Sequence, residues 1–458
     1  MDNEQIKNRL LSQKDFFDTA ETLSYRYRIS SLKKLKSAIL KYEEEIYEAL
    51  WKDLHKSKFE AYASEIGFVL EELSFHIKKL KNWMKPKRVR SSLTMFPAST
   101  YRYYEPLGSV LIIAPWNYPF QLLIAPLIGA ISAGNTAILK PSEYSENTAT
   151  VIKKMIESTF EPNYISVLTG DAKVSQALLK LKFDHIFFTG SPAIGKIVMK
   201  SAAEHMTPVT LELGGKSPCI VDETAKLKLA ATRIIWGKLL NAGQTCIAPD
   251  YLLIHKSVKE KFLPLLVEAI EKFYGKDASK SPDYPRIINS SNLKRLIMLT
   301  EKAHIYYGGK TDIQENYFEP TIIDNVTFDD AVMQQEIFGP ILPIITYERI
   351  EDVITKVNEN PKPLALYLFS ENRKTHKKIL ERVPAGGVNI NDTLMHIVNN
   401  KVPFGGVGNS GIGGYHGFYS FELFSNAKPF VKRGTWMDVP IRYAPYGKKL
   451  KIIKLLMK

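Results

Sequence analysis

Residues 107–219 alternate short apolar runs with segments of helical character. The apolar runs cover 110–114, 137–139, 164–168, 185–188 and 209–211. Helical patterns fill the intervals, over 120–133, 146–160, 173–181 and 191–205. Strand–helix alternation at this spacing predicts a parallel, doubly wound sheet, so the fold class is α/β. Sheets of this kind bind ligands at the carboxyl ends of their strands, where we expect the functional residues.

The flanking regions predict further substructures, as expected for a chain of 458 residues. Two amphipathic helices are predicted over 26–54 and 57–84, and we interpret them as scaffold. A second α/β unit is predicted over 224–395. Its clearest elements are a helix near 257–273 and strands at 251–255, 342–346 and 364–369. Residues 100–104 and 425–433 are candidates for exposed strands.

Composition narrows the functional classes. Two distant cysteines in the whole chain argue against a disulfide framework and for a reducing compartment. No His or Cys pair has metal-ligand spacing, so no metal site is expected. The N-terminus lacks a signal-peptide pattern, and prolines interrupt the most apolar region, so we expect a cytoplasmic protein. The net charge of +14 is spread over many lysines, which favours anionic small ligands over nucleic acid.

Cys246 is the strongest candidate for chemistry. It follows small and polar residues in Asn241-Ala-Gly-Gln-Thr-Cys246, which suits a loop open to a ligand. A thiolate is a strong nucleophile, but it needs a nearby cation or backbone N–H groups to form near neutral pH. Glu212 lies between apolar neighbours, where a carboxylate can have a raised pKa and act as a general base. The alternative, a buried and inert cysteine, is equally compatible with the local sequence.

Three other features have plainer explanations. The segment Gly190-Ser-Pro-Ala-Ile-Gly-Lys-Ile197 differs from a P-loop in its last position, where Ile replaces the Ser or Thr that binds magnesium. It still follows a strand and opens a helix, which suits a pyrophosphate. The segment Gly406-Val-Gly-Asn-Ser-Gly411 matches the G-x-G-x-x-G pattern of dinucleotide-binding loops. It follows Pro403-Phe404 and has too few residues after it for a βαβ unit, so we interpret it as a tight loop. Cys219, flanked by strand residues, is expected in the core.

Taken together, these segments resemble the aldehyde dehydrogenase superfamily, and in detail its class-three group. The matching segments are Ala114-Pro-Trp-Asn-Tyr-Pro119, Gly134-Asn-Thr-Ala-Ile-Leu-Lys-Pro-Ser-Glu143, Phe188-Thr-Gly-Ser191 with Gly195, Leu211-Glu-Leu-Gly-Gly-Lys-Ser-Pro218, Asn241-Ala-Gly-Gln-Thr-Cys246, Glu336-Ile-Phe-Gly-Pro340 and Pro403-Phe-Gly-Gly-Val-Gly-Asn-Ser-Gly411. Their order and spacing fit the family over residues from about 20 to 430. The class-three features are Gly413-Gly-Tyr-His-Gly417 and Ser420-Phe-Glu-Leu-Phe424.

The resemblance implies the organisation of the chain. A Rossmann-type NAD(P)-binding domain would comprise 1–85 and 108–210, and an α/β catalytic domain 211–417. A small bridging and oligomerisation sheet would comprise 86–107 and 418–436, followed by a basic tail over 437–458. The resemblance also implies a homodimer.

The resemblance further implies NAD(P)-dependent oxidation of hydrophobic aldehydes, medium- or long-chain aliphatic or aromatic, to carboxylic acids. Cys246 would attack the aldehyde, while the side chain of Asn117 and the backbone N–H of Cys246 stabilise the oxyanion. Glu212 would activate the water that hydrolyses the thioester. Without the family pattern, Asn117 would suggest only an Asx turn before Pro119. The alternatives are a cysteine hydrolase acting on esters or thioesters, and a non-catalytic protein on the same fold.

The cofactor-binding residues are also implied by the resemblance. Lys140 and Glu143 match the ligands of the adenosine ribose, and a carboxylate at 143 repels a 2′-phosphate, which favours NAD while leaving NADP possible. Gly190, Ser191 and Gly195 match the pyrophosphate site. Glu336 matches the ligand of the nicotinamide ribose and Phe338 the residue beside the nicotinamide. Pro115 and Trp116 complete the set.

The tail is a separate feature. Its last segment, 448–458, places Lys448, Lys451, Lys454 and Lys458 on one side of a helical projection and mostly apolar residues on the other. The segment is too short to span a bilayer. It could make weak peripheral contact with an anionic membrane, cap the substrate tunnel, or pack on a partner subunit.

Overall fold

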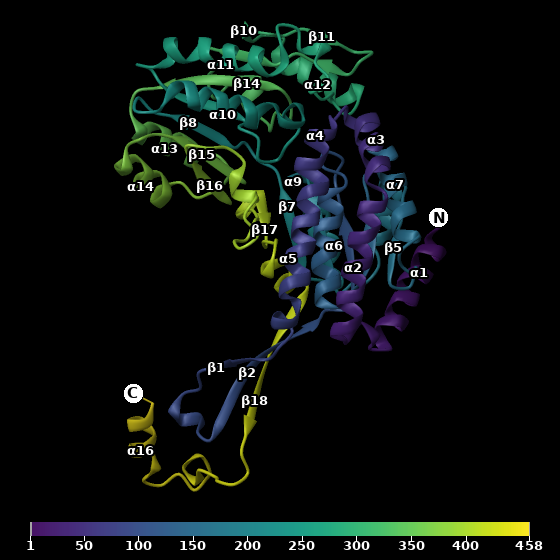
Figure 1. Cartoon of the computed structure of the whole chain (residues 1–458). Coiled ribbons are helices and arrows are strands. Elements are labelled where there is room, and N and C mark those ends of the chain that lie inside the picture. The colour runs from purple at the N-terminus through teal and green to yellow at the C-terminus, as the bar shows by residue number, and fades with distance from the viewer. Residues whose placement is uncertain (1, 458) are drawn as a thin grey trace.

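Two α/β units and a slender arm make up the computed structural model, which describes residues 2–457 (Figure 1). The first unit contains a six-stranded sheet that is parallel except for its edge strand β17. Its order is β17 (Gly411–Ile412), β7 (Val209–Leu213), β6 (His185–Gly190), β3 (Ser109–Ile113), β4 (Thr136–Lys140) and β5 (Ile165–Val167). The predicted parallel sheet and its strands are therefore confirmed.

Helices cover both faces of this sheet because each strand buries its alternate side chains in different cores. Val110 and Ile112 of β3 pack on one face with α2 (Tyr25–Lys41), α6 (Gln121–Ala133) and α7 (Glu146–Glu157). Leu111 and Ile113 pack on the other face with α1 (Asn3–Asp18), α8 (Ala172–Leu179) and α9 (Pro192–Ala203). Helix α6 is buried along its whole length, which explains its continuous apolar sequence.

The N-terminal helices differ from the prediction. Helix α1 was not predicted, because only Ile6, Leu10 and Gln13 of its residues are buried and the apolar periodicity is weak. The single helix predicted over 26–54 is wrong: α2 ends at Lys41 and α3 (Glu43–Leu54) begins with three glutamates, which favour a helix N-terminus. The helix predicted over 57–84 is divided into α4 (Lys58–Ala61), a π-helical turn η2 (Tyr62–Ile66) and α5 (Gly67–Trp83).

The second unit is built on a seven-stranded sheet, parallel except for its edge strand β10. Its order is β10 (His304–Tyr307), β13 (Thr321–Asp324), β14 (Ile341–Tyr347), β9 (Tyr251–His255), β8 (Pro218–Val221), β15 (Ala365–Phe369) and β16 (Gly387–Ile390). The helices are α10 (Leu227–Leu239), α11 (Lys259–Tyr274), α12 (Ser290–Thr300), α13 (Ile350–Glu359) and α14 (Arg373–Arg382). The predicted strands and the predicted helix of this unit are present. Cys219 lies wholly buried in β8, as expected.

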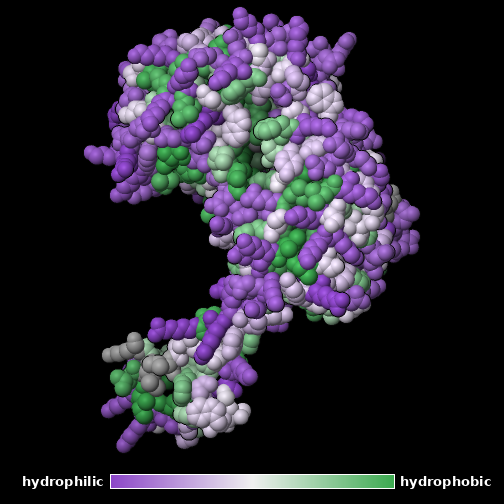
Figure 2. Space-filling view, in the orientation of Figure 1, coloured by the Kyte–Doolittle hydropathy of each residue, from purple (hydrophilic) through white to green (hydrophobic). Residues whose placement is uncertain are grey.

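The arm consists of β1 (Lys87–Val89), β2 (Ala98–Pro106) and β18 (Ser425–Arg433), paired antiparallel. Helix α15 (Phe418–Leu423) leads into it. The arm projects away from both α/β units and carries the tail helix α16 (Lys449–Leu456) at its far end (Figure 1). Figure 2 shows hydrophobic residues beside hydrophilic ones at this tip, where Leu450, Ile452 and Leu455 are exposed. Within residues 2–457 no helix is long and apolar enough to cross a membrane.

The position of α16 bears on the alternatives for the tail. At the tip of the arm it lies away from both α/β units (Figure 1), so it does not cap a tunnel within those units of its own chain. Lys458, one of the lysines of the predicted basic face, lies outside the described residues.

Candidate active site

The loop that carries Cys246 has an unusual backbone. Asn241 and Ala242 have φ angles of 53° and 51°, and Gly243 follows at 75°. A non-glycine residue in this left-handed region typically costs about 1–3 kcal/mol, and such strain persists where the surroundings fix it. The Gln244 side chain provides part of that support. Its Nε2 donates to the carbonyls of Asn241 (3.1 Å) and Arg286 (2.9 Å), and its Oε1 accepts from the N–H of Ile288 (2.9 Å). The sequence therefore forms a fixed loop that presents Cys246.

Cys246 faces Glu212 directly. The Sγ atom lies 3.3 Å from Glu212 Oε1, although the two residues come from different units of the fold. Burial raises the pKa of Glu212 to about 7, and the hydrogen bond from Cys246 only partly opposes this shift. Burial, followed by the charges of Glu212 and Glu336, raises the pKa of the Cys246 thiol well above its ordinary value. The side chain that the structure places beside the thiol is therefore a carboxylate, and the raised pKa of Cys246 favours the protonated thiol, which donates to Glu212.

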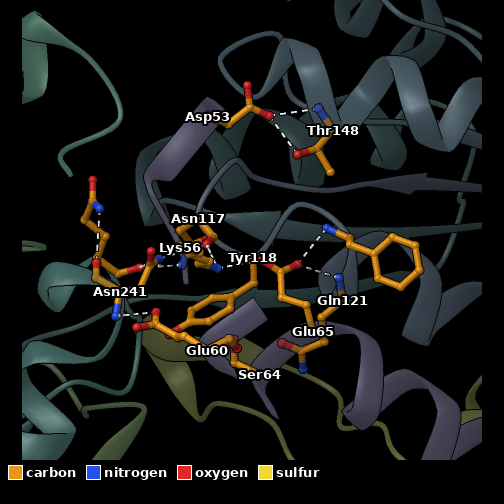
Figure 3. Close-up of polar contacts among 12 residues, drawn as sticks. Asp53, Lys56, Glu60, Ser64, Glu65, Asn117, Tyr118, Gln121, Thr148 and Asn241 are labelled. Atoms are coloured by element: carbon orange, nitrogen blue, oxygen red, sulfur yellow. Dashed lines mark hydrogen bonds and ion pairs between the residues drawn. The ribbon is translucent and has the colours of Figure 1, made fainter. Parts of the chain in front are cut away.

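Asn117 reaches the same loop from the first sheet. It follows the carboxyl end of β3, and its side-chain Nδ2 donates to the backbone carbonyl of Gln244 (2.9 Å). Its own carbonyl accepts hydrogen bonds from Asn241 Nδ2 and Lys56 Nζ, both at 2.8 Å (Figure 3). The Asn117 side chain is buried, and the carbonyl to which it donates belongs to Gln244, two residues before Cys246. The structure thus brings Cys246, Glu212 and Asn117 together.

Two cavities meet at Cys246. One, of about 720 Å³, is lined mainly by apolar and aromatic side chains, and the other, of about 500 Å³, lies at the carboxyl ends of β3, β6 and β7. Cys246, Glu212 and Leu122 line both. The larger cavity is lined, among others, by Phe59, Phe68, Tyr118, Trp236, Phe273, Tyr274, Leu394, Ile397 and Phe404. A thiol with a separate cavity on either side can contact two different ligands at once.

The smaller cavity fits a nicotinamide dinucleotide. Of the predicted cofactor residues, those that line it are Pro115, Trp116, Gly190, Ser191, Glu336 and Phe338. Ser191 caps α9, so the N-terminus of that helix, with the N–H of Ala193, meets the cavity, as suits a pyrophosphate. A Cβ atom added to Gly214 would lie 2.1 Å from Glu336 Oε2, so glycine is needed for this carboxylate to approach. Burial raises the pKa of Glu336 to about 8.

Three predicted cofactor residues do not line that cavity. Lys140 ends β4 beside β3, is almost fully buried, and donates to the carbonyl of Pro141 (2.8 Å). Its Nζ lies 3.8 Å from Glu143 Oε2, and the Glu143 side chain is partly exposed. Both residues lie at the same sheet edge as the cavity, farther along the strand order. Gly195 lets α9 approach β7, since an added Cβ atom would meet Leu213 Cδ2 at 2.7 Å.

Sequence reasoning missed several lining residues. Asn292 and Arg295 of α12 line the smaller cavity, and Arg295 Nη2 donates to the carbonyl of Ile337 (2.7 Å). The larger cavity takes much of its wall from 57–68, so the interpretation of that segment as scaffold is wrong. Its apolar spacing is the same for a core face and for a cavity wall, and no signal in a single sequence separates the two. Within residues 2–457 no cluster of metal-ligating side chains occurs.

Comparison with known proteins identifies the class to which this fold and this site belong. The chain belongs to the aldehyde dehydrogenase family, whose profile matches residues 1–430. It is an aldehyde dehydrogenase, an oxidoreductase that uses NAD or NADP. The predicted family, the fold class and the cofactor are thereby confirmed.

The relatives place the chain near the class-three group. It is 50% identical over 455 residues to the 4,4'-diaponeurosporen-aldehyde dehydrogenase of Staphylococcus aureus (strain NCTC 8325 / PS 47), covering 99% of both chains. It is 44% identical over 431 residues to the dimeric NADP-preferring aldehyde dehydrogenase of Canis lupus familiaris, covering 94% of this chain and 95% of the other. Further relatives are named as members of aldehyde dehydrogenase family 3. A solved structure of Staphylococcus aureus AldH in a substrate-bound state matches with a TM-score of 0.98 at 50% identity, covering 99% of both chains.

Proposed function

We propose that this enzyme oxidises hydrophobic aldehydes, medium- or long-chain aliphatic or aromatic, to carboxylic acids through a covalent intermediate on Cys246. The observation that carries the proposal is the apolar cavity of about 720 Å³ that ends at the thiol. A long apolar substrate would bury its chain there and place its carbonyl carbon at Sγ. The aldehyde in the name of the Staphylococcus aureus relative supports this class of substrate.

In the first half of the reaction, Cys246 Sγ attacks the carbonyl carbon to form a thiohemiacetal. The thiol proton passes to Glu212, whose carboxylate lies 3.3 Å away. The oxyanion would accept hydrogen bonds from the Asn117 side chain and from the backbone N–H of Cys246. When bound, NAD or NADP supplies the acceptor for the hydride that leaves the substrate carbon. The product of this half is a thioester on Cys246.

In the second half, Glu212 loses its proton to solvent and then takes one from water. The resulting hydroxide attacks the thioester carbon, and the carbon–sulfur bond breaks to release the carboxylic acid. The Cys246 thiolate recovers a proton from Glu212. The pKa of the Glu212 carboxyl, about 7, suits a group that must accept and release a proton in each cycle.

A panel of aldehydes tests the proposed substrate class. With saturating NAD, kcat/KM should rise with chain length from acetaldehyde to dodecanal as more of the apolar cavity is filled, by on the order of a few-fold for each buried CH₂. NADH absorbance provides the rate. A preference for short or charged aldehydes would contradict the proposal, and repeating the panel with NADP gives the cofactor preference, for which Glu143 favours NAD.

The pH dependence of turnover should report Glu212. Because the carboxylate is the active form and burial raises its pKa to about 7, kcat should be constant above that pH. It should fall about tenfold for each unit below it. The profile is measured at saturating NAD and aldehyde. If kcat instead began to fall only near the ordinary pKa of a glutamate, Glu212 with its raised pKa would not be the base.

The chain organisation is part of the proposal. Residues 1–85 and 108–210 would bind the cofactor, 211–417 would carry the nucleophile, and 86–107 with 418–436 would join two subunits. The word "dimeric" in the name of the canine relative supports a homodimer. We also propose that the protein is cytoplasmic.

Weak contact of the basic tail with an anionic membrane stays a prediction. The exposed apolar residues of α16 alternate with lysines, as in helices that lie on a membrane surface. Deleting 447–458 should reduce co-sedimentation with phosphatidylglycerol vesicles at low salt. Equal sedimentation of the truncated and full-length proteins would rule this contact out.

A further inference from the structure

A buried ion pair lies behind the segment that carries Asn117. Lys56 Nζ lies 2.5 Å from Glu65 Oε1, and neither side chain is exposed at all. Lys56 follows α3, whereas Glu65 belongs to the π-helical turn η2 (Figure 3). Burying two charges costs several kcal/mol each in desolvation, and an apolar pair of the same size is often as stable. The remaining polar contacts of both side chains are with residues 117–121.

Besides Glu65, the Lys56 ammonium group contacts Asn117 and Tyr118. Its Nζ donates to the backbone carbonyl of Asn117 (2.8 Å) and lies 3.9 Å from the centre of the Tyr118 ring. The Tyr118 hydroxyl in turn shares a hydrogen bond of 2.7 Å with Thr245 Oγ1, next to Cys246. An ammonium group has three N–H donors, and the three contacts account for all of them.

Glu65 holds the other end of the same segment. Its second oxygen, Oε2, accepts from the backbone N–H groups of Phe120 (2.9 Å) and Gln121 (3.1 Å). Helix α6 begins at Gln121, and its N-cap residue Phe120 provides no side-chain cap. A carboxylate at this point satisfies donors that the helix leaves free and interacts favourably with its dipole. Lys56 therefore binds the start of segment 117–121 and Glu65 binds its end.

We propose that Lys56 and Glu65 are positioning residues that set the direction of the Asn117 side chain for oxyanion stabilisation. This inference rests on the proposed function, in which the Asn117 amide donates to the oxyanion. The same carbonyl of Asn117 also accepts from Asn241 Nδ2, so the pair links the amide to the left-handed loop before Cys246. A misplacement of about 1 Å can cost on the order of 10²-fold in rate. A role confined to packing would not require the hydrogen bonds and the aromatic contact of Lys56 Nζ to end on Glu65 and on this segment.

The test uses the full-length enzyme with both charges removed together. In the double variant Lys56→Met with Glu65→Gln, neither member of the pair leaves the charge of the other without its partner, and the glutamine oxygen can still accept from the helix N-terminus. We expect kcat for a long-chain aldehyde to fall about 10- to 100-fold. The KM for the aldehyde and the Kd for NAD should stay within about threefold, because neither cavity wall changes. Lys58→Met is the matched control, since this exposed lysine lies two residues away and pairs with Glu44, and its kcat should equal that of the parent.

A double-mutant cycle separates positioning from a general structural effect. Combining the double variant with Asn117→Ala should lower kcat no further than Asn117→Ala alone, because the pair would act only through that amide. Multiplicative losses would overturn the inference, as would an unchanged kcat in the double variant of an active parent. A parent enzyme that oxidises no aldehyde would instead contradict the proposed function. Thermal unfolding of each variant confirms that the folded state is being compared.

Discussion

Replacing Cys246 with alanine should reduce aldehyde oxidation by on the order of 10⁴-fold or more, as removal of a catalytic nucleophile does in hydrolases. Both cavities end at this thiol, and the adjacent Thr245 hydroxyl is already hydrogen-bonded to Tyr118. No nearby side chain of the described residues can therefore take its place. NADH formation with a long-chain aldehyde measures the loss, while NAD binding measured by calorimetry should persist, because the residues around the dinucleotide are unchanged.

The control is the other cysteine. Cys219 is fully buried in β8, so Cys219→Ala should retain activity at a modest cost in stability. Substantial turnover by Cys246→Ala, or a loss of activity in Cys219→Ala without unfolding, would contradict the assignment of the nucleophile.

Replacing Glu212 with glutamine should abolish steady-state turnover while leaving a burst of about one NADH per active site. Hydrolysis of the thioester would lose its base, with an expected decrease of roughly 10²- to 10⁴-fold. Acylation is affected less, since two effects oppose each other. The thiol loses a carboxylate acceptor, but the charge of Glu212 that raises the pKa of Cys246 is also removed.

Stopped-flow absorbance resolves the burst from the steady state. Glu348→Gln provides a matched control, because this glutamate is exposed and pairs with Lys256 on the surface. A variant at Glu212 that turns over normally but shows no burst would exclude the role of general base in hydrolysis.

The sheet that positions the site was predictable because it depends on periodicity. The side chains of an apolar run such as 110–114 pack alternately into the cores on the two faces of the sheet. A parallel strand that is buried on both faces needs such a continuous apolar run, so the run predicts the strand. The same runs end near Asn117, Gly190 and Glu212, and the structure has these residues at or just beyond the carboxyl ends of β3, β6 and β7. Helix α1 was not predictable in this way, because most of its surface faces solvent and its sequence carries little apolar pattern.

The cavity walls could not be predicted for a different reason. Phe59 and Phe68 are apolar residues of a helical segment, as in a core, yet they line the larger cavity, and the π-helical turn η2 lies between them. The left-handed conformation of Asn241 and Ala242 is likewise fixed by distant contacts through Gln244, not by local propensity. The pair Lys56 and Glu65 would pass for surface charges in the sequence.

Intact-protein and peptide mass spectrometry of the Glu212→Gln variant tests the central claim most directly. Incubated with NAD and dodecanal, the variant should accumulate a dodecanoyl group on Cys246, formed only when the dinucleotide is present. An unmodified Cys246, an acyl group on another residue, or acylation by an ester with no need for NAD would contradict the account, and the last result would favour a cysteine hydrolase.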